Sequence, residues 1–226
     1  MKNKKIAAIV PALNEEANVE RVLRVLLSSK DINQVILVDD GSTDKTAEVA
    51  GKAGAEVIKL PENGGKGNAM LQGVKHTNAD IIVFFDADLT GLSDSHISLL
   101  IEPILKDNFE MCVGIRDRYW GLPKLIARID PLLAISGERA IKRELIGEIS
   151  DKFIQGFTIE TSLNYYCATK KIPVKHTLLK NLNAIIKERK WGFKKGFISR
   201  LKMIADIIKI RLALLVDKRF KNELIQ

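Results

Sequence analysis

Short apolar runs alternate with longer amphipathic stretches along the first half of the chain. Four of these runs are rich in β-branched or aliphatic residues: Ile6–Val10, Gln34–Val38, Glu56–Leu60 and Ile81–Phe85. Runs that are apolar without alternation are typical of strands that helices cover on both faces of a parallel sheet. The stretches between them predict helices over residues 17–29, 43–53 and 66–76. This βαβα order predicts an α/β fold with a mostly parallel, doubly wound sheet.

The second half of the chain has a less regular pattern. It predicts helices over residues 95–106 and 123–135, strands over 109–115 and 172–179, a turn into a helix over 136–140, and a helix that follows 156–160 and reaches about residue 169. A long terminal helix is expected over residues 196–220. We therefore expect one domain, residues 1–180, followed by a basic amphipathic helical tail, residues 181–226.

Charge is distributed unevenly between the domain and the tail. The 226-residue chain has a net charge of +8, whereas residues 170–226 alone contain 16 Lys and Arg against 4 Asp and Glu. The predicted terminal helix also has two apolar stripes separated by basic residues. Such a helix suits an anionic membrane surface or a homodimer contact, and the pattern does not separate these two partners. A nucleic-acid partner is not expected, because it would leave the acidic strand ends described below unexplained.

Cysteine spacing and the length of the apolar runs bear on localisation. Cys112 and Cys167 lie far apart and lack C-x-x-C spacing, which favours a reducing compartment. No stretch has the ~20 apolar residues of a membrane-spanning helix, and the apolar run near the N-terminus is too short for a signal peptide. These features predict a cytoplasmic protein, in solution or peripheral on the inner face of the cell membrane.

Polar residues gather where the first four predicted strands end. The four segments are Pro11–Glu16, Asp39–Asp44, Pro61–Gly67 and Asp86–Asp88. In open α/β sheets ligands bind beyond the carboxyl ends of the strands, so we expect these segments to form a single site. Asp86 and Asp88 are two residues apart and project to the same side of an extended chain. Their mutual repulsion predicts a divalent cation, Mg²⁺ or Mn²⁺, shared with phosphate oxygens; the alternative is that they cap a helix.

Two of these segments also indicate nucleotide binding. After the second strand, an aspartate can accept hydrogen bonds from a base or a ribose, and Ser42 or Thr43 is expected to cap the next helix. Gly64–Gly67 opens the third helix, where backbone N–H groups and Lys66 can approach a phosphate, although a plain Gly-rich turn is the structural alternative. The spacing matches neither the P-loop nor G-x-G-x-x-G, which disfavours an ATPase and a dinucleotide dehydrogenase.

Two later segments complete a pattern that resembles the family-2 glycosyltransferases of the GT-A fold. These segments are Ser136–Ala140, which matches S-G-x-R-A, and Gly156–Glu160, which matches G-x-x-x-E. The resemblance spans about residues 5–180. It implies transfer of a sugar from a nucleotide diphosphate sugar donor to an acceptor, with Mg²⁺ or Mn²⁺ as the cofactor.

The resemblance also implies roles for individual residues. For nucleotide-sugar binding it implies Pro11, Leu13, Glu15, Asp40, Lys66, Asp86, Arg116 and Glu138. The implied metal ligands are Asp86, Asp88 and His176, and the implied catalytic residues are Asp88 and Glu160. Thr161 follows Glu160 where many inverting members have an aspartate, so the choice between a retaining and an inverting reaction stays open.

Two acceptors and one other reaction remain open at this point. The basic and aromatic tail favours a polyprenyl phosphate at a membrane, and the second candidate is a soluble phosphorylated acceptor such as phosphoglycerate, as in the glucosyl-phosphoglycerate synthases. Sugar nucleotidyltransferases share the sheet and the metal chemistry. They usually carry a Gly-rich run directly after the first strand, where this chain has Pro11–Glu16.

Overall fold

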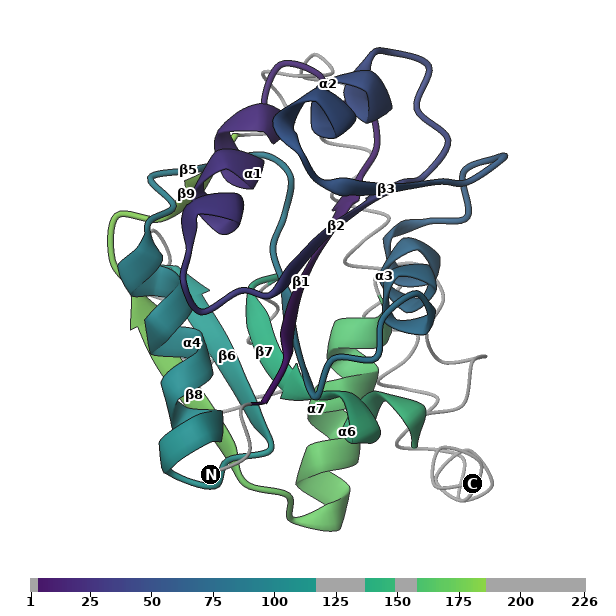
Figure 1. The fold of residues 1–226 in the computed structure, drawn as a ribbon. Coiled ribbons are helices and arrows are strands. Elements are labelled where there is room, and N and C mark those ends of the chain that lie inside the picture. Colours follow the sequence, from purple (N-terminus) through teal and green to yellow (C-terminus); the bar gives the residue numbers. More distant parts are fainter. Residues whose placement is uncertain (1–3, 117–136, 149–157, 186–226) are drawn as a thin grey trace.

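The fold is organised around a seven-stranded sheet in the order β3-β2-β1-β4-β7-β6-β8 (Figure 1). The computed structural model describes residues 4–116, 137–148 and 158–185. The strands of the sheet are β1 (Ile6–Ala12), β2 (Gln34–Asp39), β3 (Glu56–Lys59), β4 (Ile81–Phe84), β6 (Met111–Arg116), β7 (Arg139–Lys142) and β8 (Val174–Leu179). All neighbouring strands are parallel except that β7 runs antiparallel to both β4 and β6. The mostly parallel, doubly wound sheet is therefore as predicted.

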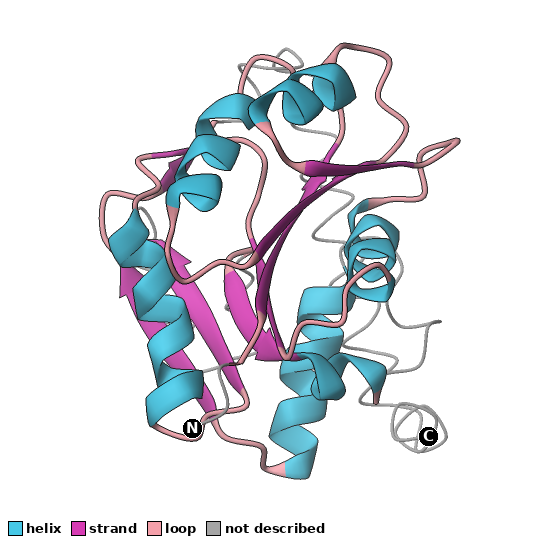
Figure 2. Cartoon of the chain, viewed as in Figure 1, coloured by secondary structure: helices cyan, strands magenta, loops and turns pink. Residues whose placement is uncertain are grey.

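Helices cover both faces of this sheet (Figure 2). One face packs against α1 (Val19–Ser28), α2 (Thr46–Ala53) and α4 (Asp94–Lys106), and the other against α3 (Lys66–Lys75), α6 (Arg143–Gly147) and α7 (Thr158–Lys170). Alternate residues of the central strand divide between the two cores: Ala8 and Val10 face the first layer, and Ala7 and Ile9 face the second. Burial on both faces explains why the sequence of this strand shows no polar alternation.

The edge strand β3 departs from the expected burial. Its side chains are mostly exposed, because it pairs with β2 on one side only and lies at the margin of the sheet. The turn into a helix that was predicted over residues 136–140 departs further from the structure. Of residues 137–140, which the structure describes, the last two belong to β7, which lies between β4 and β6, and the helix α6 begins only at Arg143. A strand that pairs on both sides is specified by its neighbours more than by its own four residues.

A small second sheet lies beyond the carboxyl end of β4. It consists of β5 (Leu89–Thr90) and β9 (Asn183–Ala184), which pair antiparallel. The backbone N–H of Ile185 also donates to the carbonyl oxygen of Asp88, at 3.2 Å. The segment after β8 is thereby held beside the Asp86–Asp88 motif, close to the centre of the predicted site.

Several predictions concern residues outside the described ranges. These are the helix over 123–135, the terminal helix over 196–220 and most of the tail, including its basic and aromatic segment. Membrane attachment and dimer formation through the tail therefore stay predictions. Within residues 4–116, 137–148 and 158–185, no helix combines the length and the apolar character needed to cross a bilayer.

Candidate active site

The loops that follow β1 and β2 are joined to each other by hydrogen bonds. The backbone N–H of Asn14 donates to Ser42 Oγ, and the backbone N–H of Thr43 donates to Asn14 Oδ1, both at 2.9 Å. Asn14 has a φ of 55°, a left-handed conformation that asparagine tolerates better than most residues. The prediction that Ser42 or Thr43 caps the next helix is therefore wrong: α2 begins at Thr46, whose backbone N–H donates to Asp44 Oδ1.

The predicted nucleotide-binding residues of the first loop lie at the end of β1. Pro11 is buried in the strand, opposite Val38 of β2, and Leu13 and Glu15 are half-buried in the loop that follows. The Glu15 carboxylate accepts a hydrogen bond from Asn18 Nδ2 at 3.0 Å. These residues stand next to the boundary between β1 and β4, where the chain reverses the direction in which it adds strands and where doubly wound sheets bind ligands.

Asp40 binds the glycine loop that precedes α3. Its two carboxylate oxygens accept the backbone N–H groups of Gly64 and Gly65, each at 2.9 Å. Burial raises the pKa of Asp40, and the two hydrogen bonds offset part of that rise. We predicted that the loop amides face a phosphate and that Asp40 binds nucleotide directly. In this structure the amides are satisfied by Asp40, which fixes the start of α3.

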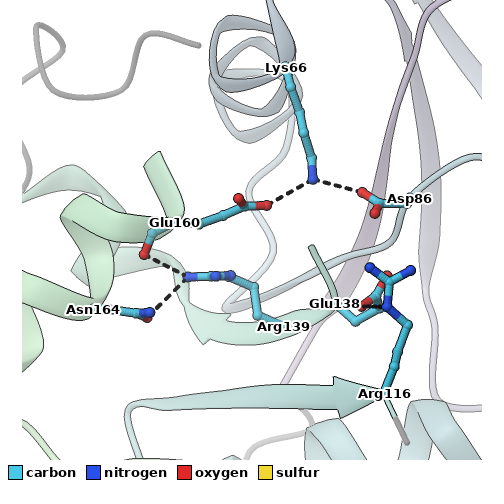
Figure 3. A network of polar contacts seen from close by, with 7 residues as sticks. All are labelled: Lys66, Asp86, Arg116, Glu138, Arg139, Glu160 and Asn164. Atoms are coloured by element: carbon cyan, nitrogen blue, oxygen red, sulfur yellow. Dashed lines mark hydrogen bonds and ion pairs between the residues drawn. The ribbon is translucent and has the colours of Figure 1, made fainter. Parts of the chain in front are cut away.

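Lys66, the first residue of α3, lies between two predicted site carboxylates (Figure 3). Its Nζ is 2.7 Å from Asp86 Oδ1 and 2.8 Å from Glu160 Oε1. The Glu160 side chain is only 2% exposed, whereas those of Lys66 and Asp86 are 22% and 23% exposed. Burial by itself would lower the pKa of Lys66, but the charges of Asp86 and Glu160 outweigh it and raise that pKa. The lysine therefore stays protonated between its two partners.

A second ion pair lies beside the first. Arg116 ends β6, and its Nε is 3.5 Å from Glu138 Oε2 (Figure 3). Glu138 is fully buried, whereas Arg116 is 12% exposed. The structure thus pairs two of the residues that the resemblance assigned to nucleotide-sugar binding, where β6 ends and β7 begins.

Arg139 binds the backbone of Glu160, and no role was predicted for it from the sequence. It is fully buried on β7, and its Nη1 donates to the Glu160 carbonyl oxygen at 3.4 Å and to Asn164 Oδ1 at 3.5 Å. Burial lowers the pKa of the guanidinium, while the neighbouring Glu160 and Glu138 carboxylates oppose that shift. Arg139 therefore ties the first turns of α7 to the sheet. The signal in the sequence was the arginine of the S-G-x-R-A segment, which is Arg139.

His176 lies apart from the other predicted metal ligands. It lies in β8, opposite Val113 of β6. Strand β8 is three strands away from β4, so the two strands are about 14 Å apart at ~4.8 Å per strand. The described residues contain no group of three His, Cys, Asp or Glu side chains that could hold a metal ion. Partial burial and the Arg139 charge lower the pKa of His176, although its side chain is largely exposed. The structure does not bring His176 together with Asp86 and Asp88, and its role as a metal ligand stays a prediction.

Comparison with known proteins agrees with the motifs. The family model described as "Glycosyl transferase family 2" matches residues 7–164, which is more than half of the chain. The chain belongs to this family. The motifs at the strand ends and the S-G-x-R-A and G-x-x-x-E segments all lie within the matched region.

The relatives of this family-2 chain include enzymes that are named for different acceptors. A glucosyl-3-phosphoglycerate synthase of Mycobacterium tuberculosis is 30% identical over 195 residues, covering 70% of this chain and 59% of the relative. A 4,4'-diaponeurosporenoate glycosyltransferase of Staphylococcus aureus is 36% identical over 104 residues, covering 44% of this chain and 28% of the relative. The chain thus spans about three fifths or less of the length of these curated relatives.

The fold of this family-2 chain is also that of a solved relative. The glucosyl-3-phosphoglycerate synthase of M. tuberculosis, in complex with Mn²⁺, uridine-diphosphate-glucose and phosphoglyceric acid, aligns with a TM-score of 0.69 and 26% identity, covering 80% of this chain and 72% of that one. The same enzyme was solved with Mg²⁺ and uridine-diphosphate, at a TM-score of 0.69 and 25% identity. The GT-A-type architecture predicted from the motifs is thereby confirmed.

Gly41 gives a test of how tightly the loops of this family-2 site are packed. It has a φ of +77°, and a Cβ there would lie 2.8 Å from the Glu62 carbonyl carbon and 2.9 Å from the Asn63 nitrogen. Both atoms belong to backbone, so Gly41→Ala is expected to lower the free energy of unfolding by about 2 kcal/mol.

The matched control for this substitution is Gly147→Ala. A Cβ at Gly147, in α6, meets nothing within 4 Å, so the control is expected to be neutral or to stabilise by up to ~1 kcal/mol. Urea denaturation of both variants measures the difference. Equal midpoints for the two would show that the packing of the loops around Gly41 is not tight.

Proposed function

We propose that this protein transfers a sugar from a nucleotide diphosphate sugar to a phosphate-bearing acceptor, in a reaction that depends on Mg²⁺ or Mn²⁺. The observation that carries this proposal is the position of Asp86 at the carboxyl end of β4. There its carboxylate binds the Lys66 ammonium, which also binds the buried Glu160 carboxylate. Membership of glycosyl transferase family 2 and the relatives solved with UDP-glucose and Mn²⁺ support the same reaction.

The residues at the end of β4 fit a divalent metal ion. Asp86 and Asp88 supply carboxylate oxygens, the ligand type that Mg²⁺ and Mn²⁺ prefer. The Lys66 ammonium, 2.7 Å from Asp86, shows that positive charge is stable at this position. A metal ion held there would neutralise the charge that develops on the departing nucleoside diphosphate.

In this proposal the surrounding residues bind and orient the donor. Pro11, Leu13 and Glu15 line the nucleotide side of the site, at the end of β1. Asp40 acts on the donor through the loop that it holds, because its oxygens bind the Gly64 and Gly65 amides.

The second group of residues orients the transferred sugar and the acceptor. Arg116 supplies a positive charge for a phosphate and is itself oriented by Glu138. Glu160 lies across from Asp86 on the other side of Lys66, where a sugar attached to the diphosphate would be held. Thr161 follows Glu160 where many inverting members have an aspartate. A threonine there suits a phosphate acceptor, which is already nucleophilic and needs no strong base.

The two phosphate-bearing acceptors have different support. The complexes of the relative with phosphoglyceric acid favour a small phosphorylated acid. The net charge of residues 170–226, 16 basic against 4 acidic, favours a polyprenyl phosphate at an anionic membrane surface.

A donor and acceptor panel tests the proposal. The full chain is incubated with Mn²⁺ and UDP-, GDP- or dTDP-sugars, with either 3-phosphoglycerate or a short polyprenyl phosphate in detergent, and nucleoside diphosphate release is measured. We expect release with one donor to rise at least about tenfold when one of the two acceptors is added. Release that no acceptor raises, together with no melting shift by any donor, would contradict the proposal.

A further inference from the structure

The Lys66 side chain is bonded to Asp86, one of the two proposed metal ligands. Its ammonium lies 2.7 Å from Asp86 Oδ1 and 2.8 Å from Glu160 Oε1, and joins the start of α3, the end of β4 and the first turn of α7 (Figure 3). The ammonium therefore bridges the two carboxylates as their shared counter-ion.

Asp86 has little room to turn away from this cation. A Cβ placed on Gly137 would clash with Asp86 Oδ1 and lie 2.7 Å from Oδ2, so the backbone at Gly137, two residues before β7, lies directly against the carboxylate. A divalent ion on Asp86 and an ammonium on the same carboxylate repel each other strongly at such short separations. Binding of the metal therefore requires Lys66 to give up Asp86.

The backbone of Lys66 is fixed, whereas its side chain can exchange partners. Asp40 holds the amides of Gly64 and Gly65 and thereby anchors the start of α3. The lysine side chain is a flexible four-carbon stem that ends in three N–H donors. It can keep Glu160 as a partner while it replaces Asp86 with an oxygen of a nearby diphosphate.

We propose that Lys66 is the resident counter-ion of Asp86, and that it moves to the donor diphosphate when the metal ion takes its place. This inference rests on the proposed function and adds to it a residue that sets the order of binding. Without nucleotide, the metal has to displace Lys66 and binds weakly. With nucleotide, the displaced ammonium gains a phosphate partner, so each ligand increases the affinity for the other by the same factor.

Calorimetric titration of Mn²⁺ into the full chain, with and without UDP, tests this inference through the Lys66→Gln variant. We expect the variant to bind Mn²⁺ alone about tenfold more tightly than the wild-type protein, because no ammonium has to be displaced. We also expect the factor by which UDP increases Mn²⁺ affinity to fall about tenfold. A residue that only stabilises the fold would not raise metal affinity.

Two further variants serve as controls for this experiment. Lys66→Gln leaves the buried Glu160 carboxylate without its ammonium, which can lower the stability of the protein. The double variant Lys66→Gln with Glu160→Gln is therefore measured beside it. It should show the same rise in Mn²⁺ affinity. Lys75→Gln removes the same charge from the exposed last turn of α3 and should leave both quantities unchanged.

The outcomes separate this inference from the proposed function. Unchanged or weaker Mn²⁺ binding by both Lys66 variants, while the wild-type protein binds Mn²⁺ with UDP, would overturn the inference and leave the function standing. A similar rise in the Lys75 variant would overturn it too, because a general loss of positive charge would then be the cause. Wild-type protein that binds no Mn²⁺ even with UDP would overturn the proposed function and the inference together.

Discussion

Replacing Arg139 with methionine is expected to lower the free energy of unfolding by about 3–5 kcal/mol. The substitution removes a buried positive charge close to Glu160 and Glu138, and it leaves the oxygens that Arg139 binds without their N–H donor. Arg139 is fully buried on β7, and its guanidinium bonds to the Glu160 carbonyl oxygen and to Asn164. Glu138 is also fully buried, and Glu160 is 2% exposed. Methionine fills much of the volume but supplies no positive charge.

Arg143→Met is the matched control for this prediction. Arg143 begins α6, four residues after Arg139, and its side chain is exposed. The control is expected to change the free energy of unfolding by no more than ~0.5 kcal/mol. Urea denaturation followed by circular dichroism measures both variants. Unfolding of the Arg139 variant at the wild-type midpoint would show that Arg139 does not hold the site together.

The first half of the fold could be predicted closely from the sequence, and the reason lies in its central strands. β1, β2 and β4 are buried on both faces, so each appears in the sequence as an apolar run, and the structure ends each within two residues of the prediction. Loop residues were predicted less well. Serine and threonine commonly cap helices, but Ser42 and Thr43 both bind Asn14 of another loop. Residue types alone cannot show a contact between loops that are distant in sequence.

β7 could not be recognised from its own residues. Arg139–Lys142 contains two basic residues in four, and it becomes a central strand because β4 and β6 pair with it on both sides. Its arginine is tolerated in the core because α7 offers partners, an interaction between residues 21 and 25 positions apart. The two-residue strands β5 and β9 are too short to carry any periodic signal.

The sequence indicates which residues gather at the candidate site, but not which of them bind one another. The motifs place Lys66, Asp86 and Glu160 in one site, and the structure brings their side chains together. That Asp40 binds backbone amides depends on the path of the glycine loop, which residue types do not specify. The resemblance implied His176 as a metal ligand, whereas its distance from β4 depends on the order of the strands in the sheet.

Asp88→Asn is expected to abolish metal-dependent donor binding and to lower the rate of sugar transfer by about a thousandfold or more. Asp88 is half-buried two residues beyond Asp86, and its backbone is held by Ile185, so the variant should stay folded. An amide oxygen is a weaker ligand than a carboxylate for a hard cation, and loss of the metal leaves the leaving diphosphate without charge neutralisation.

Asp80→Asn is the control for this substitution. Asp80 stands at the opposite end of the same strand, where its carboxylate accepts the backbone N–H of Lys5 at 2.7 Å. The control removes the same charge from β4 but lies away from the carboxyl ends of the strands. It is expected to keep metal-dependent binding and sugar transfer at the wild-type level.

Calorimetric titration of UDP into wild-type protein and the Asp88→Asn and Asp80→Asn variants, in Mn²⁺ and then in excess chelator, tests most directly whether the end of β4 holds a metal–diphosphate pair. We expect Mn²⁺ to tighten UDP binding by about a hundredfold or more in the wild-type protein and the Asp80 variant, and to have no effect on the Asp88 variant. Wild-type protein that binds UDP equally well with Mn²⁺ and with chelator, or an Asp88 variant that keeps the full metal effect, would contradict it.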